Sequence, residues 1–143
     1  MQFSYLFRRI AFALAVMMAL TQTAPAQQAG LHLELNAMDD IAGECRLTFV
    51  GNNATQIDVL QIAYDAFIFD GSGIVTDRLI LDFGRLRPAR TRVLQFQLAR
   101  GCAQISRVLL NEVQDCTMQD GLRSEMCIDA LSTTSRAGAQ FGL

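Results

Sequence analysis

Strict alternation of apolar and polar side chains is the feature that most narrows what this chain can fold into. In LHLEL (residues 31–35) three leucines share one parity, and His32 and Glu34 share the other. ECRLTFV (44–50) alternates in the same way. A period of two residues is that of a β-strand with one face in a core. Both stretches are therefore predicted to be half-buried strands, and GNNATQ (51–56) is predicted to be the turn that follows.

The longest apolar segment, IDVLQIAYDAFIFD (57–70), is predicted to be a third strand. A helix is the competing interpretation, but β-branched and aromatic residues and the glycine turn that follows favour a strand. Phe67 and Phe69 have the outward parity, which predicts a central strand that is partly covered on its second face. The residues of the other parity are expected to face the core: Leu60, Ile62, Tyr64, Ala66 and Ile68.

The rest of the chain continues the pattern. After the DGSG turn, IVTDRLILDF (74–83), TRVLQFQLA (91–99) and AQISRVLLNEV (103–113) are predicted strands, with a short helix or loop before Cys127 and a last strand over 132–139. Six or seven short strands separated by Gly, Asn and Asp turns indicate an all-β, immunoglobulin-like antiparallel β-sandwich, formed by residues 27–143 as a single domain. The side chains expected to face inward are Val75, Leu79, Leu81, Phe83, Leu94, Phe96 and Leu98.

The first 26 residues have the layout of a secretory signal peptide. Arg8 and Arg9 precede an apolar run over 10–20, and Ala24-Pro25-Ala26 forms a small-residue cleavage site. The run is shorter than the ~20 residues that cross a bilayer, so no membrane insertion is expected after cleavage. The paired arginines leave the twin-arginine route open, although the general route is favoured. The predicted address is the periplasm.

Four cysteines in an exported domain of this size predict two disulfides. If successive strands run up and down, Cys45 and the connection that holds Cys102 lie at one end of the sandwich. Cys116 then ends the sixth strand at the opposite end, within reach of Cys127. The pairs Cys45–Cys102 and Cys116–Cys127 are favoured among the three connectivities. A zinc site would need closer cysteine spacing than this chain has.

Charge and residue usage argue against several classes of function. Without Arg8 and Arg9 the chain carries 10 basic residues against 14 acidic ones, a net charge of −4, which gives no sign of a nucleic-acid partner. There is no lysine, His32 is the only histidine, and no serine has a nucleophile-elbow setting. Asp39 and Asp40 are expected to be solvated in a loop. FDGSGIVTD (69–77) fails the calcium-loop pattern, because with its glycine at Gly71 the first ligand position falls on Ala66 and the twelfth, usually Glu, on Asp77. Asp70-Gly71 suits a hairpin turn better. No catalytic residue, metal or cofactor is predicted.

The segment GRLRPARTR (84–92) is the candidate binding site, with four arginines in nine residues: Arg85, Arg87, Arg90 and Arg92. They are placed in the connection between the fourth and fifth strands, where Pro88 prevents regular pairing. One interpretation is a solvated loop paired with acidic residues of the same chain, with Asp58, Asp77 and Asp82 as candidates. The other is a partner-binding rim, because arginine is favoured at interfaces and for carboxylate or phosphate.

The run from LTFVGNN (47–53) through LQIAYDAFIFDGSG to LQFQL (94–98) resembles the FxLYD-type extracytoplasmic domains. Ile68, Phe69 and Asp70 are the counterparts of their strand end, and a glycine turn and Phe96 follow. With its four cysteines and RVLLNEVQDC (107–116), the whole mature chain is similar to a group of small uncharacterised exported proteins of alphaproteobacteria, several of them labelled by a twin-arginine signal. The resemblance implies an immunoglobulin-like sandwich and a periplasmic address, and it implies no activity.

The sequence therefore predicts a non-catalytic periplasmic binding or accessory module, with an envelope protein as its partner and a sheet edge or the arginine rim as its contact. A small-ligand or anion-binding carrier is the first alternative, and it would need an open apolar cavity between the sheets. A hydrolase is the third, and it would need a cleft that joins His32 to a carboxylate.

Overall fold

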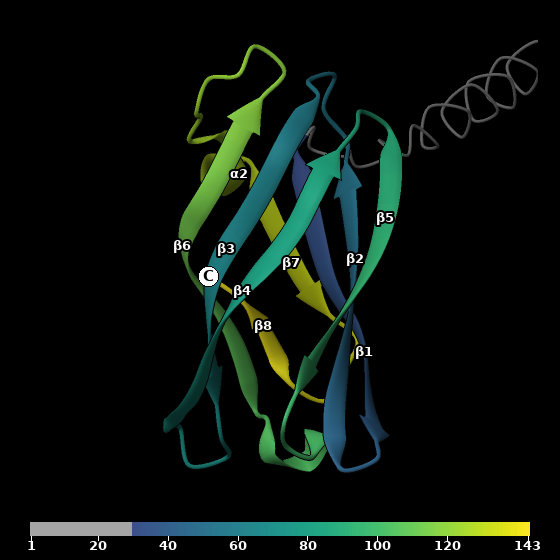
Figure 1. Cartoon of the computed structure of the whole chain (residues 1–143), viewed down its shortest axis with the longest axis vertical. Helices are drawn as coiled ribbons and strands as arrows, with labels where there is room; N and C mark the ends of the chain where they lie inside the picture. The colour runs from purple at the N-terminus through teal and green to yellow at the C-terminus, as the bar shows by residue number, and fades with distance from the viewer. Residues whose placement is uncertain (1–29) are drawn as a thin grey trace, which may run out of the picture.

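Two four-stranded sheets packed face to face make up the computed structural model, which describes residues 30–143 (Figure 1). The predicted signal peptide, residues 1–26, lies outside the described residues. One sheet has the order β5-β2-β1-β7, and the other has the order β4-β3-β6-β8. Their bounds are β1 Leu31–Ile41, β2 Glu44–Asn53, β3 Val59–Phe69, β4 Val75–Leu86, β5 Arg90–Leu98, β6 Arg107–Met118, β7 Leu131–Ser135 and β8 Gln140–Gly142. A short 3₁₀ helix, η1 (Cys102–Gln104), precedes β6, and a single helical turn, α2 (Met126–Asp129), precedes β7.

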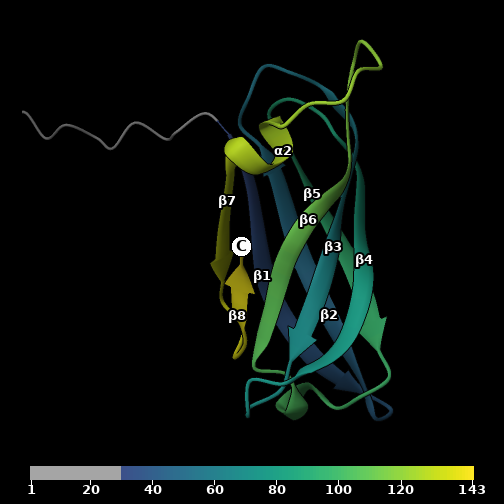
Figure 2. The same ribbon diagram turned by 90° about the vertical axis from the view of Figure 1, so that its left-hand side faces the viewer.

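The connections between the sheets confirm the predicted sandwich. The chain passes from one sheet to the other between β2 and β3 and at every connection from β4 to β8, as in Greek-key immunoglobulin-like folds. Figure 2 shows the two layers from the side. No helix among residues 30–143 has the length and apolar character needed to span a bilayer.

The end of the chain differs from the prediction of one strand over 132–139. It forms two short strands, β7 in one sheet and β8 in the other, and each is parallel to its neighbour. The direction of β7 follows from α2, which returns the chain to the end where β1 begins, so that the Leu31 amide donates to the Ala130 carbonyl at 2.9 Å. From there β7 runs beside β1 in the same direction.

The inward positions of both sheets form one core. Phe49 lies at its centre and makes edge-to-face contacts with Phe83 and Phe96, with ring centroids 5.8 Å apart in both pairs. The Tyr64 ring is also fully buried, and its hydroxyl donates a hydrogen bond to the Cys127 carbonyl. Burial of this phenol in apolar surroundings raises its pKa well above the ordinary value.

Both predicted disulfides are present. Cys45–Cys102 joins the start of β2 to η1, with Cα atoms 4.7 Å apart. Cys116–Cys127 joins β6 to α2 at the other end of the sandwich, with Cα atoms 5.9 Å apart. The coincidence of strand ends that predicted the pairing is therefore confirmed. Such bonds are typical of an oxidising, extracytoplasmic compartment.

The predicted burial of two residues is wrong. Leu60 is 36% exposed and Val75 is 48% exposed. Each lies where the pairing of β3 with β4 changes register. Leu60 lies in the shift between Val59 and Ile62 of β3, and Val75 of β4 pairs with Phe69, next to the shift between Ile68 and Phe69. An irregularity of this kind interrupts the alternation, so a count of parity along the sequence places these side chains on the wrong face.

The second face of β3 is covered by arginine side chains. β3 is central, with β4 and β6 as its neighbours, as predicted. The guanidinium groups of Arg78 and Arg107 lie over the rings of Phe67 and Phe69 at 5.8 and 5.7 Å from their centroids. Arg78 also pairs with Asp65 at 2.6 Å, and only 3% of the Asp65 side chain is exposed.

Several strands run further than predicted. β1 continues to Ile41, so Asp39 and Asp40 lie on a strand instead of in a loop. Asp40 Oδ1 accepts a hydrogen bond from the Cys102 amide at 2.8 Å, which ties β1 to η1. β2 continues to Asn53 through residues expected to form a turn, and β4 and β5 extend into the arginine segment.

Candidate functional site

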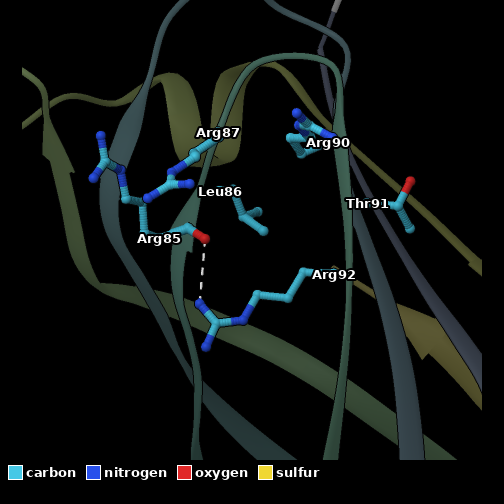
Figure 3. A pocket seen from close by; sticks show the side chains of 6 residues that line it. All are labelled: Arg85, Leu86, Arg87, Arg90, Thr91 and Arg92. Carbon is cyan, nitrogen blue, oxygen red and sulfur yellow. Dashed lines mark hydrogen bonds between the residues drawn. The ribbon is translucent and has the colours of Figure 1, made fainter.

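The four arginines surround a pocket of about 410 Å³ at one side of the sandwich (Figure 3). Arg85 lies on β4, Arg90 and Arg92 lie on β5, and Arg87 lies in the three-residue connection between these strands. Leu86 and Thr91 complete the lining. Because β4 and β5 are the edge strands of opposite sheets, this short connection closes the side of the sandwich. The sequence placed all four arginines in the connection, whereas three of them lie on strands.

A glycine bulge on β4 makes room for Arg92. Gly84 has a φ of +60°, a conformation that favours glycine, and it lies where β4 shifts register against β3. A Cβ at Gly84 would lie 2.8 Å from Arg92 Nη1. The Arg92 side chain therefore crosses from one sheet to the other, and its Nη1 donates to the Arg85 carbonyl at 3.2 Å.

Asp58 neutralises Arg85. Arg85 Nε lies 3.0 Å from Asp58 Oδ1 and 3.2 Å from Oδ2, and its Nη2 also bonds to Oδ2. Hydrogen bonding from Arg85 lowers the pKa of Asp58, to which the charge of Arg87 also contributes, and the same hydrogen bond raises the pKa of Arg85. Of the four arginines, Arg85 is the one that forms an ion pair with a carboxylate of the described residues.

The other two acidic residues proposed to offset the cluster are used elsewhere. Asp77 pairs with Arg100 at 2.6 Å. Asp82 Oδ1 accepts hydrogen bonds from Gln61 Nε2 at 2.6 Å and from the Gly84 amide at 2.7 Å, so Asp82 holds the bulge.

Arg87 and Arg90 carry the uncompensated charge of the pocket. Both are exposed, and neither forms an ion pair with any carboxylate of the described residues 30–143. Each guanidinium presents up to five donors in a planar fork that matches a carboxylate or phosphate group. The pocket therefore combines two unpaired cations with a third, Arg92, which donates one hydrogen bond to a carbonyl.

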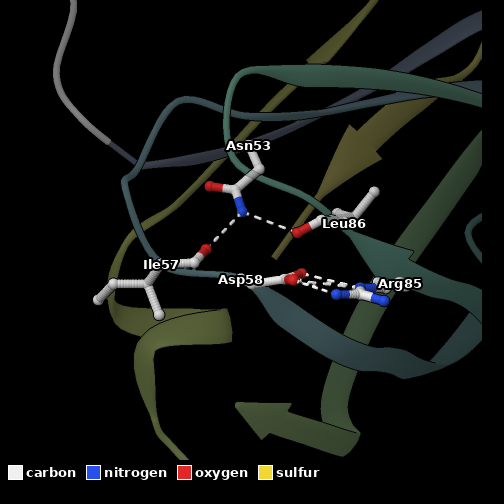
Figure 4. A network of polar contacts seen from close by, with 5 residues as sticks. All are labelled: Asn53, Ile57, Asp58, Arg85 and Leu86. Carbon is white, nitrogen blue, oxygen red and sulfur yellow. Dashed lines mark hydrogen bonds and ion pairs between the residues drawn. The ribbon is translucent and has the colours of Figure 1, made fainter. Parts of the chain in front are cut away.

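Asn53, which was predicted to lie in a turn, positions the connection that carries these arginines (Figure 4). Its fully buried amide donates to the carbonyls of Ile57 and Leu86, both at 2.8 Å. Its Oδ1 accepts from the amide and the hydroxyl of Thr55 at 2.9 and 2.6 Å. The Asn53 carbonyl accepts from the Ala89 amide at 2.8 Å. One residue thus joins the end of β2 to the end of β4 and to the arginine turn.

The remaining candidate residues have structural environments. His32 is half-buried on the outer face of β1, with Nδ1 3.1 Å from Ser132 Oγ and Nε2 3.2 Å from Thr134 Oγ1. Asp70 Oδ1 accepts from the amides of Ser72 and Ile74 at 2.9 and 3.0 Å, which confirms its use in a hairpin turn. The described residues bring no three His, Cys, Asp or Glu side chains together as a metal site.

Comparison with known proteins supports the fold. No family model and no curated protein sequence matches the chain. Among solved structures, the chain is similar to IrmA from Escherichia coli, with a TM-score of 0.56 and 10% identity, over 73% of this chain and 90% of that one. A likeness at this identity concerns the fold alone.

Proposed function

We propose that the protein is a non-catalytic binding module of the periplasm that holds an acidic group of a partner in the pocket formed by Arg85, Leu86, Arg87, Arg90, Thr91 and Arg92, hereafter the arginine pocket. The observation that carries this proposal is the contrast among the four arginines. Arg85 is paired and Arg92 has a carbonyl acceptor, whereas Arg87 and Arg90 have no carboxylate partner among the described residues. Like charges held this close repel one another, and an anionic partner would relieve that repulsion.

The periplasmic address rests on the two disulfides, on the signal-peptide layout of residues 1–26, and on the resemblance to exported proteins of alphaproteobacteria. We expect cleavage after Ala26. Amino-terminal sequencing of the exported protein should therefore return Gln27, whereas Met1 would contradict the proposed export.

A photo-crosslinking residue in place of Thr91, which is exposed and lines the pocket, tests the binding function in living cells. A discrete crosslinked product is expected, and mass spectrometry identifies it. The same crosslinker at Ser72, in the turn at the opposite end of β4, is the positional control.

The charge dependence is tested with Arg87→Gln/Arg90→Gln. This variant should lose the product that forms at Thr91 and should melt within a few degrees of the wild type, because exposed charges contribute little to stability. The charge control, Arg123→Gln/Arg136→Gln, removes two arginines elsewhere, of which Arg136 is paired with Glu34, and it should keep the product. An undiminished product in the first variant would refute the role of the pocket.

A small-anion carrier is the alternative that the pocket also favours, because its volume of about 410 Å³ admits a carboxylate or phosphate compound. Titration with citrate and with inorganic phosphate distinguishes the two. Under the binding-module proposal these ions should bind weakly and compete with the crosslinked partner only at high concentration, in the manner of salt screening.

A further inference from the structure

The edge strand β5 continues directly from the arginine pocket, and it differs from the other sheet edges of the described chain. β5 pairs with β2 over nine consecutive residues, from Asn53↔Arg90 to Cys45↔Leu98, without a register shift. Its other side has no strand neighbour among the described residues. Only Leu98, its last residue, is buried. Its free edge therefore presents a regular row of main-chain N–H and C=O groups to solvent.

The other three edges carry features that hinder strand addition. β4 has register irregularities, one of them at Gly84, and charged side chains along its length. β7 has five residues and β8 has three. Bulges, charges and short length are the usual means by which proteins protect a sheet edge. In β5 the stretch from Val93 to Leu98, sequence VLQFQL, has none of them.

Charge is distributed unevenly along β5. Arg90 and Arg92 lie at its start, beside Arg87, and no acidic residue occurs anywhere in the strand. Beyond Arg92 the strand is uncharged, Val93 is 60% exposed, and Leu94 and Phe96 are half-buried at the border of the core. A complementary strand would therefore be acidic at one end and apolar along the rest.

We propose that an extended segment of a partner protein, acidic at one end, adds to the free edge of β5 as a fifth strand and places its carboxylates in the arginine pocket. This inference rests on the proposed binding function and specifies its partner. Main-chain hydrogen bonds to the edge provide affinity in this mode of recognition, and the side chains at the ends provide specificity. A small anion would use the pocket and leave the edge of β5 unpaired.

Peptides of about ten residues, the length of a typical long strand, provide the test. The first probe alternates Thr and Val and ends in two Glu residues, and the second has the same composition with the two Glu residues at its start. The proposed addition is antiparallel. Arg90 and Arg92 lie at the start of β5, so the first probe places its carboxylates at the arginines in antiparallel pairing, and the second does so only in the less stable parallel pairing. We expect their affinities to differ on the order of tenfold, the effect of two charge pairs at an accessible site. Equal affinities would overturn the proposal.

N-methylation of the peptide backbone tests the main-chain contacts. Successive N–H groups of a strand point to opposite sides, so methylation of one alternate set should abolish binding of the better peptide, and methylation of the other set should not. Hydrogen exchange of the full exported chain should slow at those amides of 93–98 that point away from β2 when the peptide binds. If both methylated peptides bind equally, or if protection is confined to 85–92, the edge is not used.

Variants of the protein complete the test. Val93→Glu introduces a negative charge at the exposed edge and should weaken binding at least tenfold. Ile80→Glu, a change at an exposed apolar residue of the other edge strand, should leave it unchanged. Equal effects would overturn strand addition. If these probes show no edge signature while Arg87→Gln/Arg90→Gln still abolishes crosslinking at Thr91, strand addition fails and the binding function stands. If that variant leaves crosslinking intact, the binding function itself fails.

Discussion

Replacement of Asn53 by Asp should destabilise the domain, although the two side chains have nearly the same shape. The amide of the fully buried Asn53 donates to two carbonyls at 2.8 Å, that of Leu86 in a buried setting and that of Ile57 in a partly buried one. Asn53→Asp removes both donors and turns a carboxylate oxygen toward the same carbonyls. A buried polar group that loses its partner costs about 1–3 kcal/mol. For two neighbouring carbonyls we expect a total loss of about 3 kcal/mol, out of the ~5–15 kcal/mol typical of a domain.

Thermal unfolding followed by circular dichroism measures this loss. With a shift of about 4 °C per kcal/mol for a domain of this size, the midpoint should fall by about 10–15 °C near neutral pH. Asn52→Asp is the matched control, because it makes the same chemical change one residue away, where the amide donates only to Thr91 Oγ1 at 3.1 Å on the exposed face. Its effect should stay below about 1 kcal/mol.

The pH dependence of Asn53→Asp has a definite sign. Burial beside carbonyl oxygens should raise the pKa of the introduced carboxyl above its unfolded value of about 3.9. The protonated form can still donate one hydrogen bond, so the stability deficit relative to the wild type should shrink at acid pH and grow as pH rises through the raised folded-state pKa. A deficit equal to that of Asn52→Asp, or one that stays constant with pH, would refute the role assigned to Asn53.

Two further predictions concern the cross-links and the ion pairs. The Cys45–Cys102 disulfide closes the longer loop, so on the chain-entropy account its replacement by two serines should lower the free energy of unfolding by about 4 kcal/mol, and loss of the second disulfide should lower it by about 3 kcal/mol. Urea unfolding of the two double variants should give this order, and the reverse order would contradict the prediction. Acid should destabilise the wild type, because hydrogen bonds lower the folded-state pKa of two carboxyl groups. Arg85 donates to Asp58, and Asn36, followed in size of effect by Arg136, donates to Glu34. This contribution to stability is fully present above the unfolded pKa of about 4 and is lost as pH falls through the lowered values. A thermal unfolding midpoint that stays constant as the pH is lowered below 4 would contradict the prediction.

The alternation of side chains was sufficient to predict the fold class because period two survives in most of each strand. It also placed the strand ends well enough to predict both disulfides. It failed at Leu60 and Val75, where irregular pairing of β3 changes the face. Such irregularities depend on the neighbouring strands, which are distant in sequence, so parity counted along one strand cannot locate them. The two short parallel strands at the end were missed because five and three residues carry too little pattern.

The arginine site could be located from the sequence, but its internal organisation could not. Which arginine is neutralised depends on Asp58, which lies just before β3 and is 27 residues away in sequence from Arg85. Asn53 was assigned to a turn because Asn favours turns, whereas here the fully satisfied amide stabilises a buried strand end. Gly84 was the available signal, since an isolated glycine within a strand pattern indicates a bulge.

The way this site is built separates its structural residues from its charged ones. Asn53 fixes the strand ends, Gly84 opens the bulge that Arg92 crosses, and Asp58 holds Arg85. All of these contacts remain if Arg87 and Arg90 are replaced by neutral side chains, because none of them uses either guanidinium. The one favourable contribution of these two cations to such contacts is the charge of Arg87, which helps to lower the pKa of Asp58, and repulsion within the cluster opposes their placement. The proposed strand addition would account for their placement beside an unprotected sheet edge, because an acidic strand would use both features at once.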